Sequence, residues 1–216
     1  MEKSKINLLI FGAPGSGKGT QARMLARHLD GLRVISAGDL LRDEIGKCTE
    51  IGKEVESIMR EGLLVSDALV CEMMLKKLRE VGPGFLLDGF PRSLQQAEFL
   101  SVVLQILGCS IDAVIKLEVD VEVVRDRLQG RLVCRSCGKV SNISFGETVC
   151  SECGCREYVS RSDDVAGTIK RRVMEYEFAI EELERYYGTL VVKIDGNKSV
   201  DEVFRLIRDK VDSLNN

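Results

Sequence analysis

The sequence predicts an α/β fold, a three-layer sandwich in which a five-stranded parallel sheet lies between helices. A helical insertion and a small Cys-rich β insertion complete it. Short apolar runs that end at glycine or aspartate alternate with stretches of helical periodicity, which is typical of parallel sheets covered on both faces. Two segments, 36–64 and 131–160, break that alternation. The 216 residues, 44 % apolar and 30 % charged, suit one core with outgrowths.

The elements of the core follow in order along the chain. Residues 6–11 predict the first strand, which stops at a glycine cluster, and residues 18–28 predict an amphipathic helix. Val34 and Ile35 supply the second strand. Apolar runs that each precede an aspartate and a stretch of helical spacing predict the other three strands, at 85–87, 113–117 and 191–194.

The two insertions divide this core. From Ser36 to about Leu64 the spacing fits two consecutive helices with no strand between them, whereas residues 131–160 are rich in Cys, Gly, Ser and Asn, with short β-like pieces. We therefore expect a core of residues 1–35, 65–130 and 161–216, a helical insertion of residues 36–64, and a Cys-rich insertion of residues 131–160.

Charge and apolar pattern exclude several classes of function. The net charge of −3 argues against a general nucleic-acid binder. The apolar run near the start is too short for a signal peptide, and no stretch is long enough to span a bilayer. We expect a cytoplasmic protein without membrane partners, and nothing in the sequence demands more than a monomer.

Residues 12–20 form a phosphate-binding motif. They read Gly-Ala-Pro-Gly-Ser-Gly-Lys-Gly-Thr and lie between a predicted strand and a predicted helix. Glycines let backbone N–H groups face phosphate oxygens, and the helix N-terminus adds partial positive charge. The ammonium of Lys18 would reach the β- and γ-phosphates of a nucleotide. The residues expected at the phosphates are Gly15, Ser16, Gly17, Lys18, Gly19 and Thr20.

This motif departs from the general pattern at one position. Gly19 stands where most such loops carry the Ser or Thr that ligates Mg²⁺. Thr20 can still contribute, but nucleotide oxygens and water would hold most of the ion. Asp88, at the end of a predicted strand, is the nearest acidic partner, because ligands of such sheets bind at the carboxyl ends of strands.

Five of the eight cysteines lie between positions 134 and 155. Cys134 and Cys137, and Cys150 and Cys153, form two C-x-x-C pairs with twelve residues between them, the spacing of a tetrahedral structural Zn²⁺ site. Cys155 leaves the fourth ligand open, and we favour Cys153 because its spacing repeats that of the first pair. A disulfide pair or an iron site on the same sulfurs are the alternatives.

Four separated blocks resemble adenylate kinases from end to end of the chain. They are residues 12–20, Ser36 to Arg42 (SAGDLLR), Asp88 to Arg92 (DGFPR) with Gln96, and Arg161 to Asp164 (RSDD) with Arg172. The resemblance implies a P-loop core and the reaction ATP + AMP = 2 ADP. It also implies that the helical insertion binds the monophosphate and that the Cys-rich insertion is a lid over ATP.

The resemblance also implies a role for individual side chains. It assigns ATP binding to the loop residues together with Arg127 and Arg131. It gives AMP Ser36, Arg42, Gly89, Arg92, Gln96, Arg161 and Arg172. It gives lid closure to Asp163 and Asp164, and catalysis to Lys18, Asp88, Arg92, Arg127, Arg161 and Arg172. The many cations agree with the chemistry, because phosphoryl transfer depends on positioning and charge neutralisation more than on a base.

Several polar residues in or near these motifs have a simple structural explanation. Arg127 would pair equally well with the adjacent Asp126, and Arg171 would lie in solvent. His28, the only histidine, would cap its helix. Ala37 stands where the family pattern usually has threonine, so one polar contact to AMP is missing and we expect weaker AMP binding.

Two rival functions remain. One is a kinase for another nucleoside monophosphate, against which Gln96 argues, since an amide can read an adenine edge. The other is a zinc-ribbon nucleic-acid-binding protein with a P-loop. For such a partner the loop between the cysteine pairs offers only Lys139 and Phe145.

Overall fold

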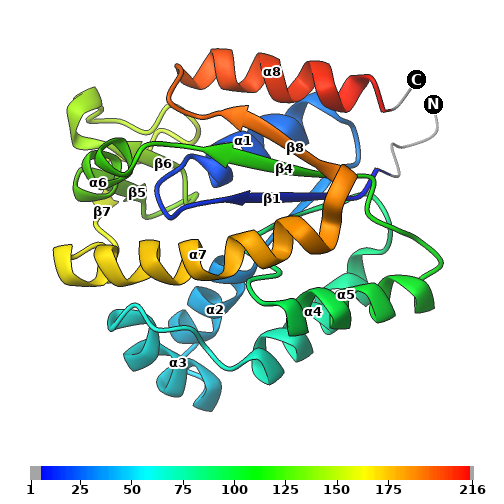
Figure 1. Cartoon of the computed structure of the whole chain (residues 1–216). Helices are drawn as coiled ribbons and strands as arrows, with labels where there is room; N and C mark the ends of the chain where they lie inside the picture. The colour runs from blue at the N-terminus through cyan, green and yellow to red at the C-terminus, as the bar shows by residue number, and fades with distance from the viewer. Residues whose placement is uncertain (1–5, 215–216) are drawn as a thin grey trace.

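The computed structural model describes residues 6–214 and contains the predicted five-stranded parallel sheet (Figure 1). Its strand order is β2-β3-β1-β4-β8, and every pair is parallel. The strands are β1 (Leu8–Gly12), β2 (Arg33–Ser36), β3 (Phe85–Asp88), β4 (Ala113–Glu118) and β8 (Val191–Asp195). All five lie where the apolar runs predict them, because buried parallel strands need continuous apolar sequence.

Helices cover both faces of the sheet, which confirms the three-layer prediction (Figure 1). Leu8 and Ile10 point to one face, where they pack with the helices α1 (Lys18–His28) and α8 (Val200–Asp212). Leu9 and Phe11 point to the other face. That face is covered by α4 (Asp67–Val81), α5 (Leu94–Ile106) and α7 (Ala166–Tyr187).

The expected helix pair of residues 36–64 is present as α2 (Ala37–Gly46) and α3 (Glu50–Arg60). A side-chain hydroxyl caps the N-terminus of each helix: Ser36 Oγ accepts from Asp39 N at 3.3 Å, and Thr49 Oγ1 accepts from Gly52 N at 3.0 Å. A Cβ at Gly52 would lie 2.2 Å from Glu44 O, so only glycine permits the close approach of α3 to α2.

The Cys-rich segment follows α6 (Val121–Gln129) and forms an antiparallel sheet of order β6-β5-β7. Its strands are β5 (Arg131–Cys134), β6 (Val140–Asn142) and β7 (Tyr158–Val159), and a 3₁₀ turn spans Ile143–Phe145. A second 3₁₀ turn, Gly188–Leu190, precedes β8. The Cys-rich segment contacts α1, where Arg23 donates to Gly138 O at 2.9 Å and Arg27 pairs with Glu152 at 2.5 Å.

His28 does not have the expected role as a helix cap. Its Nε2 lies 2.9 Å from Asp212 Oδ1, so it joins the end of α1 to the end of α8. The reason is tertiary: α1 and α8 pack side by side on one face of the sheet, which brings the two side chains together. Across the described residues, no helix combines the length and apolar character needed to cross a bilayer.

Candidate functional site

A large cavity of about 1210 Å³ opens at the carboxyl ends of β1 and β3. The rule for open parallel sheets places ligands at this edge. The volume exceeds the roughly 300–1,000 Å³ typical of a site for one drug-sized ligand. Every residue expected to contact a nucleotide lines it: Gly15, Ser16, Gly17, Lys18, Gly19, Thr20, Ser36, Arg42, Gly89, Arg92, Gln96, Arg127, Arg131, Arg161 and Arg172.

Lys18 lies at the start of α1, where its ammonium group completes the loop. Nζ donates to the carbonyl oxygens of Gly12 at 2.6 Å and Ala13 at 2.9 Å. Burial lowers its pKa to about 8, Asp88 opposes that shift, and the charges of Arg92, Arg172 and Arg131 add to it. An anion bound beside Lys18 would stabilise the buried ammonium group, so it would raise the pKa of Lys18 and favour the charged form.

Asp88 lies beside the same turn. A Cβ at Gly19 would come within 3.4 Å of Asp88 Oδ2, so the carboxylate faces the position that carries Ser or Thr in other phosphate-binding loops. The acid at the end of β3 and the loop after β1 therefore border the same space.

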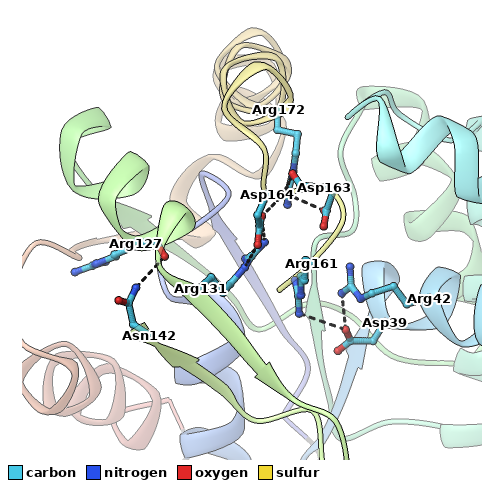
Figure 2. Close-up of polar contacts among 9 residues, drawn as sticks. All are labelled: Asp39, Arg42, Arg127, Arg131, Asn142, Arg161, Asp163, Asp164 and Arg172. Carbon is cyan, nitrogen blue, oxygen red and sulfur yellow. Dashed lines mark hydrogen bonds and ion pairs between the residues drawn. The ribbon is translucent and has the colours of Figure 1, made fainter. Parts of the chain in front are cut away.

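Arg127 lies in the last turn of α6. In the part of the chain that the structure describes, it does not form the ion pair with Asp126 that the sequence offered as the alternative. Its guanidinium donates to Ser16 O at 3.3 Å and to Gly196 O at 3.0 Å. Burial lowers its pKa. Asn142 of β6 donates to Arg127 O at 3.1 Å, so the Cys-rich segment contacts the same residue (Figure 2).

Arg131 and Arg172 meet at Asp164, as Figure 2 shows. Arg131 Nε donates to Asp164 Oδ2 at 2.6 Å, and its Nη2 contacts Asp164 Oδ1. Arg172 Nη1 lies 3.1 Å from Asp164 Oδ1 and 2.9 Å from Asp163 Oδ2. Arg172, Arg131 and two further arginines lower the pKa of Asp163, although its burial acts in the opposite direction. Asp163 lines the cavity, whereas Asp164 does not.

Arg161 lies across the cavity from α2. It pairs with Asp39 at 3.9 Å, and Asp39 also pairs with Arg42 at 2.5 Å (Figure 2). Burial, together with the charges of Arg42 and Arg131, lowers the pKa of Arg161 to about 10. Sequence reasoning did not single out Asp39, although its place three residues before Arg42 on a helix is a signal for such a pair.

Arg92 follows β3 and is fixed against its own turn. Its Nε donates to Gly89 O at 2.9 Å, and a Cβ at Gly89 would lie 3.1 Å from Arg92 Nη2. Gly89 has φ of +74°, a conformation that glycine adopts without strain. Burial lowers the pKa of Arg92, as does the charge of Arg172. Gln96, which is 3 % exposed, and Ala37, which is 4 % exposed, complete this side of the cavity.

The electrostatics of the cavity favour anions. Lys18 and all six arginines expected to contact a nucleotide line it: Arg42, Arg92, Arg127, Arg131, Arg161 and Arg172. Burial lowers the pKa of Lys18, Arg92, Arg161 and Arg172, and mutual repulsion adds to that effect. Such a cluster is stabilised by bound phosphates, to which Arg contributes permanently charged, bidentate contacts.

The four cysteines of the C-x-x-C pairs form one cluster. Their sulfurs all lie within 4.8 Å of one another, and two of the sulfur–sulfur distances are 3.6 Å. A tetrahedron with metal–sulfur bonds of about 2.3 Å has sulfurs about 3.8 Å apart, so the cluster fits a zinc ion. All eight cysteines are free, which contradicts the disulfide alternative. Four cysteines this close together can bind a metal.

The turns of the cluster are built by the glycine that follows each pair. Gly138 and Gly154 have φ near +70° and donate to Cys134 O and Cys150 O at 2.9 and 2.8 Å. Cys155 lies outside the cluster, where Glu157 N donates to its sulfur at 3.4 Å. The structure thus groups Cys153 with the other three.

A hydrogen-bonded network around Glu147 supports the cluster, and sequence reasoning missed it. Glu147 accepts from Ser141 at 2.6 Å, from Lys139 at 3.1 Å and from Tyr158 at 3.3 Å. Lys139 also contacts Ser151 Oγ at 2.6 Å. Because Lys139 is engaged inside the segment, it is a poor contact for nucleic acid, and this weakens the zinc-ribbon alternative.

Known proteins share this pattern. The family model described as adenylate kinase matches residues 10–192. A protein named adenylate kinase from Carboxydothermus hydrogenoformans is 40 % identical over 212 residues, which cover 94 % of this chain and 98 % of the relative. Adenylate kinases from Kosmotoga olearia and Wolbachia pipientis wMel are 38 % and 39 % identical, covering 97 % and 94 % of this chain and 100 % and 97 % of their own lengths.

Proposed function

The chain belongs to the adenylate kinase family, and we propose that it moves a phosphoryl group reversibly between ATP and AMP to form two ADP, as a nucleoside monophosphate phosphotransferase. The observation that carries this proposal is the convergence of Lys18 and the arginines from four separated sequence blocks on one cavity at the carboxyl ends of the sheet. Two nucleotides facing each other place their phosphates where those cations meet.

We propose that three parts share the work. A core of residues 1–35, 65–130 and 161–216 binds ATP through the phosphate loop. Residues 36–64 bind AMP, and residues 131–160 act as a lid. The separate sheet of the Cys-rich segment and the pairing of α2 with α3 support these boundaries. A closed lid would exclude water, which otherwise competes for the γ-phosphate.

The positions of the cations suggest a role for each. Lys18 and Arg127 border the loop and would hold the ATP phosphates and the nucleoside end, with Arg131 closing from β5. Arg42 and Arg92 border the opposite side and would hold the AMP phosphate. Arg161 and Arg172 lie between these groups and would neutralise charge on the transferring phosphoryl group. No residue is required as a general base.

We propose that Mg²⁺ enters as the ATP complex. Nucleotide oxygens and water would hold most of its coordination sphere, with Asp88 and Thr20 beside the loop as the nearest protein oxygen donors. The ion would neutralise charge between the phosphates.

We also propose that Zn²⁺ fills the four-cysteine cluster, with Cys134, Cys137, Cys150 and Cys153 as ligands. Four thiolates leave no open position, so the ion would stabilise the lid without touching the substrate. Free thiols of this kind suit a reducing compartment such as the cytoplasm. Since all site residues come from one chain, a monomer suffices.

The test is a comparison of acceptors. Initial rates of ADP formation with ATP and each of AMP, GMP, UMP and CMP should be highest with AMP. Preference for a pyrimidine nucleotide would instead support another nucleoside monophosphate kinase.

A further inference from the structure

The side-chain amide of Gln96 is held from both ends. Gln96 lies in the first turn of α5 and lines the cavity. Its Oε1 accepts from the backbone N–H of Arg92 at 2.7 Å, and its Nε2 donates to Asp67 Oδ1 at 2.7 Å. Gln96 is 3 % exposed, so both hydrogen bonds are largely shielded from competing water.

These two partners fix which way the amide faces. A peptide N–H can only donate, and an ionised carboxylate can only accept. Rotating the amide by half a turn would set two donors against each other at Arg92 and two acceptors against each other at Asp67. The chemistry of the partners therefore permits one orientation of Gln96.

Asp67 reaches this site from another part of the chain. It is the first residue of α4 and lies 29 positions before Gln96. Its second oxygen, Oδ2, accepts from Ser93 Oγ at 2.5 Å, and Ser93 Oγ in turn accepts from Gln96 N at 3.2 Å. The carboxylate of Asp67 thus contacts both Ser93, which caps the N-terminus of α5, and the side-chain amide of Gln96.

We propose that Asp67 is a positioning residue that sets the preference for the base of the monophosphate. With one N–H taken by Asp67 and one lone pair taken by Arg92, Gln96 keeps one N–H and one lone pair for a ligand. A 6-aminopurine offers the matching pair, an N6 donor beside the N1 acceptor. A 6-oxopurine offers the reverse pair, which only the rotated amide would match.

This inference rests on the proposed function, since it takes AMP as the acceptor. Asp67 is then the group that makes Gln96 selective. Asp67 does not line the cavity, so its effect acts through Gln96 and not through contact with the base.

The experiment measures kcat and KM for AMP and for inosine monophosphate (IMP) in the wild type and in variants at position 67. Asp67→Ala should lower the ratio of kcat/KM for AMP to that for IMP on the order of tenfold, mainly through the KM for AMP, because it removes one fixed hydrogen bond. The KM for ATP should not change. Asp67→Asn should restore most of the ratio, since its carbonyl oxygen can accept from Gln96.

Ser93→Ala is the matched control. It removes the bond to Asp67 Oδ2 and the α5 cap but leaves the bond between Asp67 and Gln96, so it should lower stability and keep the ratio. If Asp67→Ala does not fold, Asp67→Ser replaces it, because a hydroxyl can donate or accept and no longer dictates the amide orientation. An unchanged AMP to IMP ratio in the folded Asp67 variant would overturn the positioning role. A wild type that fails to phosphorylate AMP would overturn the proposed function instead.

Discussion

Asp164 holds Arg131 by two hydrogen bonds, across 33 positions of sequence that contain the whole cysteine cluster. The same carboxylate contacts Arg172 of α7 at 3.1 Å. Arg131 begins the Cys-rich segment and Asp164 follows its last residue. The Asp164 carboxylate therefore joins the two ends of the segment to each other and to Arg172, and we assign both arginines to the nucleotides. Any movement of that segment would therefore displace these arginines through Asp164.

Removal of Asp164 should destabilise the ligand-free protein strongly. Its side chain is 4 % exposed, and Asp164→Ala would leave the buried Arg131 without this partner and Arg172 with Asp163 alone, at a cost of about 3 kcal/mol. Asp39→Ala is the control, because that carboxylate is far more exposed and should cost less than about 1 kcal/mol. Urea unfolding of both variants measures the difference. Equal stability of the two variants would contradict the account.

Nucleotide binding should draw a proton onto Lys18. Its pKa of about 8 in the free protein lies below the ordinary value of 10.5 because the ammonium is buried. The ligand-free protein therefore gains stability as the pH rises from about 8 to about 10.5. A bound polyphosphate raises the pKa again, so affinity should fall up to about tenfold per pH unit above 8.

Calorimetry of a non-hydrolysable ATP analogue at pH 8.5, in buffers with different ionisation enthalpies, counts the protons taken up. Lys18→Met should abolish that uptake. Uptake of the same size in the variant would mean that another group titrates.

A zinc ion bound by the cysteine cluster should affect stability more than turnover. Elemental analysis should find one zinc ion per chain. Cys134→Ser should lose the metal and lower the Tm by about 5–10 °C, since the segment has little apolar core of its own. Its kcat should stay within about twofold, because a metal held by four thiolates would have no open position for substrate. Cys155→Ser, outside the cluster, should keep both zinc and Tm. Loss of zinc in this variant would show that Cys155, and not Cys153, is the fourth ligand.

Ala37→Thr should strengthen AMP binding. Ala37 is buried at the wall of the cavity, next to Ser36 at the start of α2. A hydroxyl that reaches AMP would contribute about 1 kcal/mol, or roughly a fivefold lower KM for AMP. The KM for ATP serves as the internal reference. A rise in the KM for AMP would show that the pocket cannot accommodate the extra atoms.

Sequence patterns predicted the sheet, its flanking helices and the cysteine cluster because each is encoded locally. The continuous apolar run of β1 and the repeated C-x-x-C spacing carry their meaning within a few residues. The helix pair α2–α3 was predictable for the same reason.

Contacts that depend on packing between distant segments were not predictable. Arg127 reaches Ser16 and Gly196, which lie 111 and 69 positions away, and its neighbour Asp126 gives no hint of this. Arg171 is exposed, as expected, but it also donates to Glu61 O at 2.8 Å just after α3, a contact that its sequence position does not indicate. Asp67 is an ordinary acid in the sequence, and only the fold brings it to Gln96, 29 positions away.

The most direct test of the central claim is ADP formation from ATP with each of AMP, GMP, UMP and CMP, on one preparation with Mg²⁺ present. We expect AMP to give the highest kcat/KM, and we expect Arg92→Lys, which loses the fork of donors, to lower it by at least about tenfold. A higher kcat/KM for UMP or CMP, or no ADP formed from AMP, would contradict it.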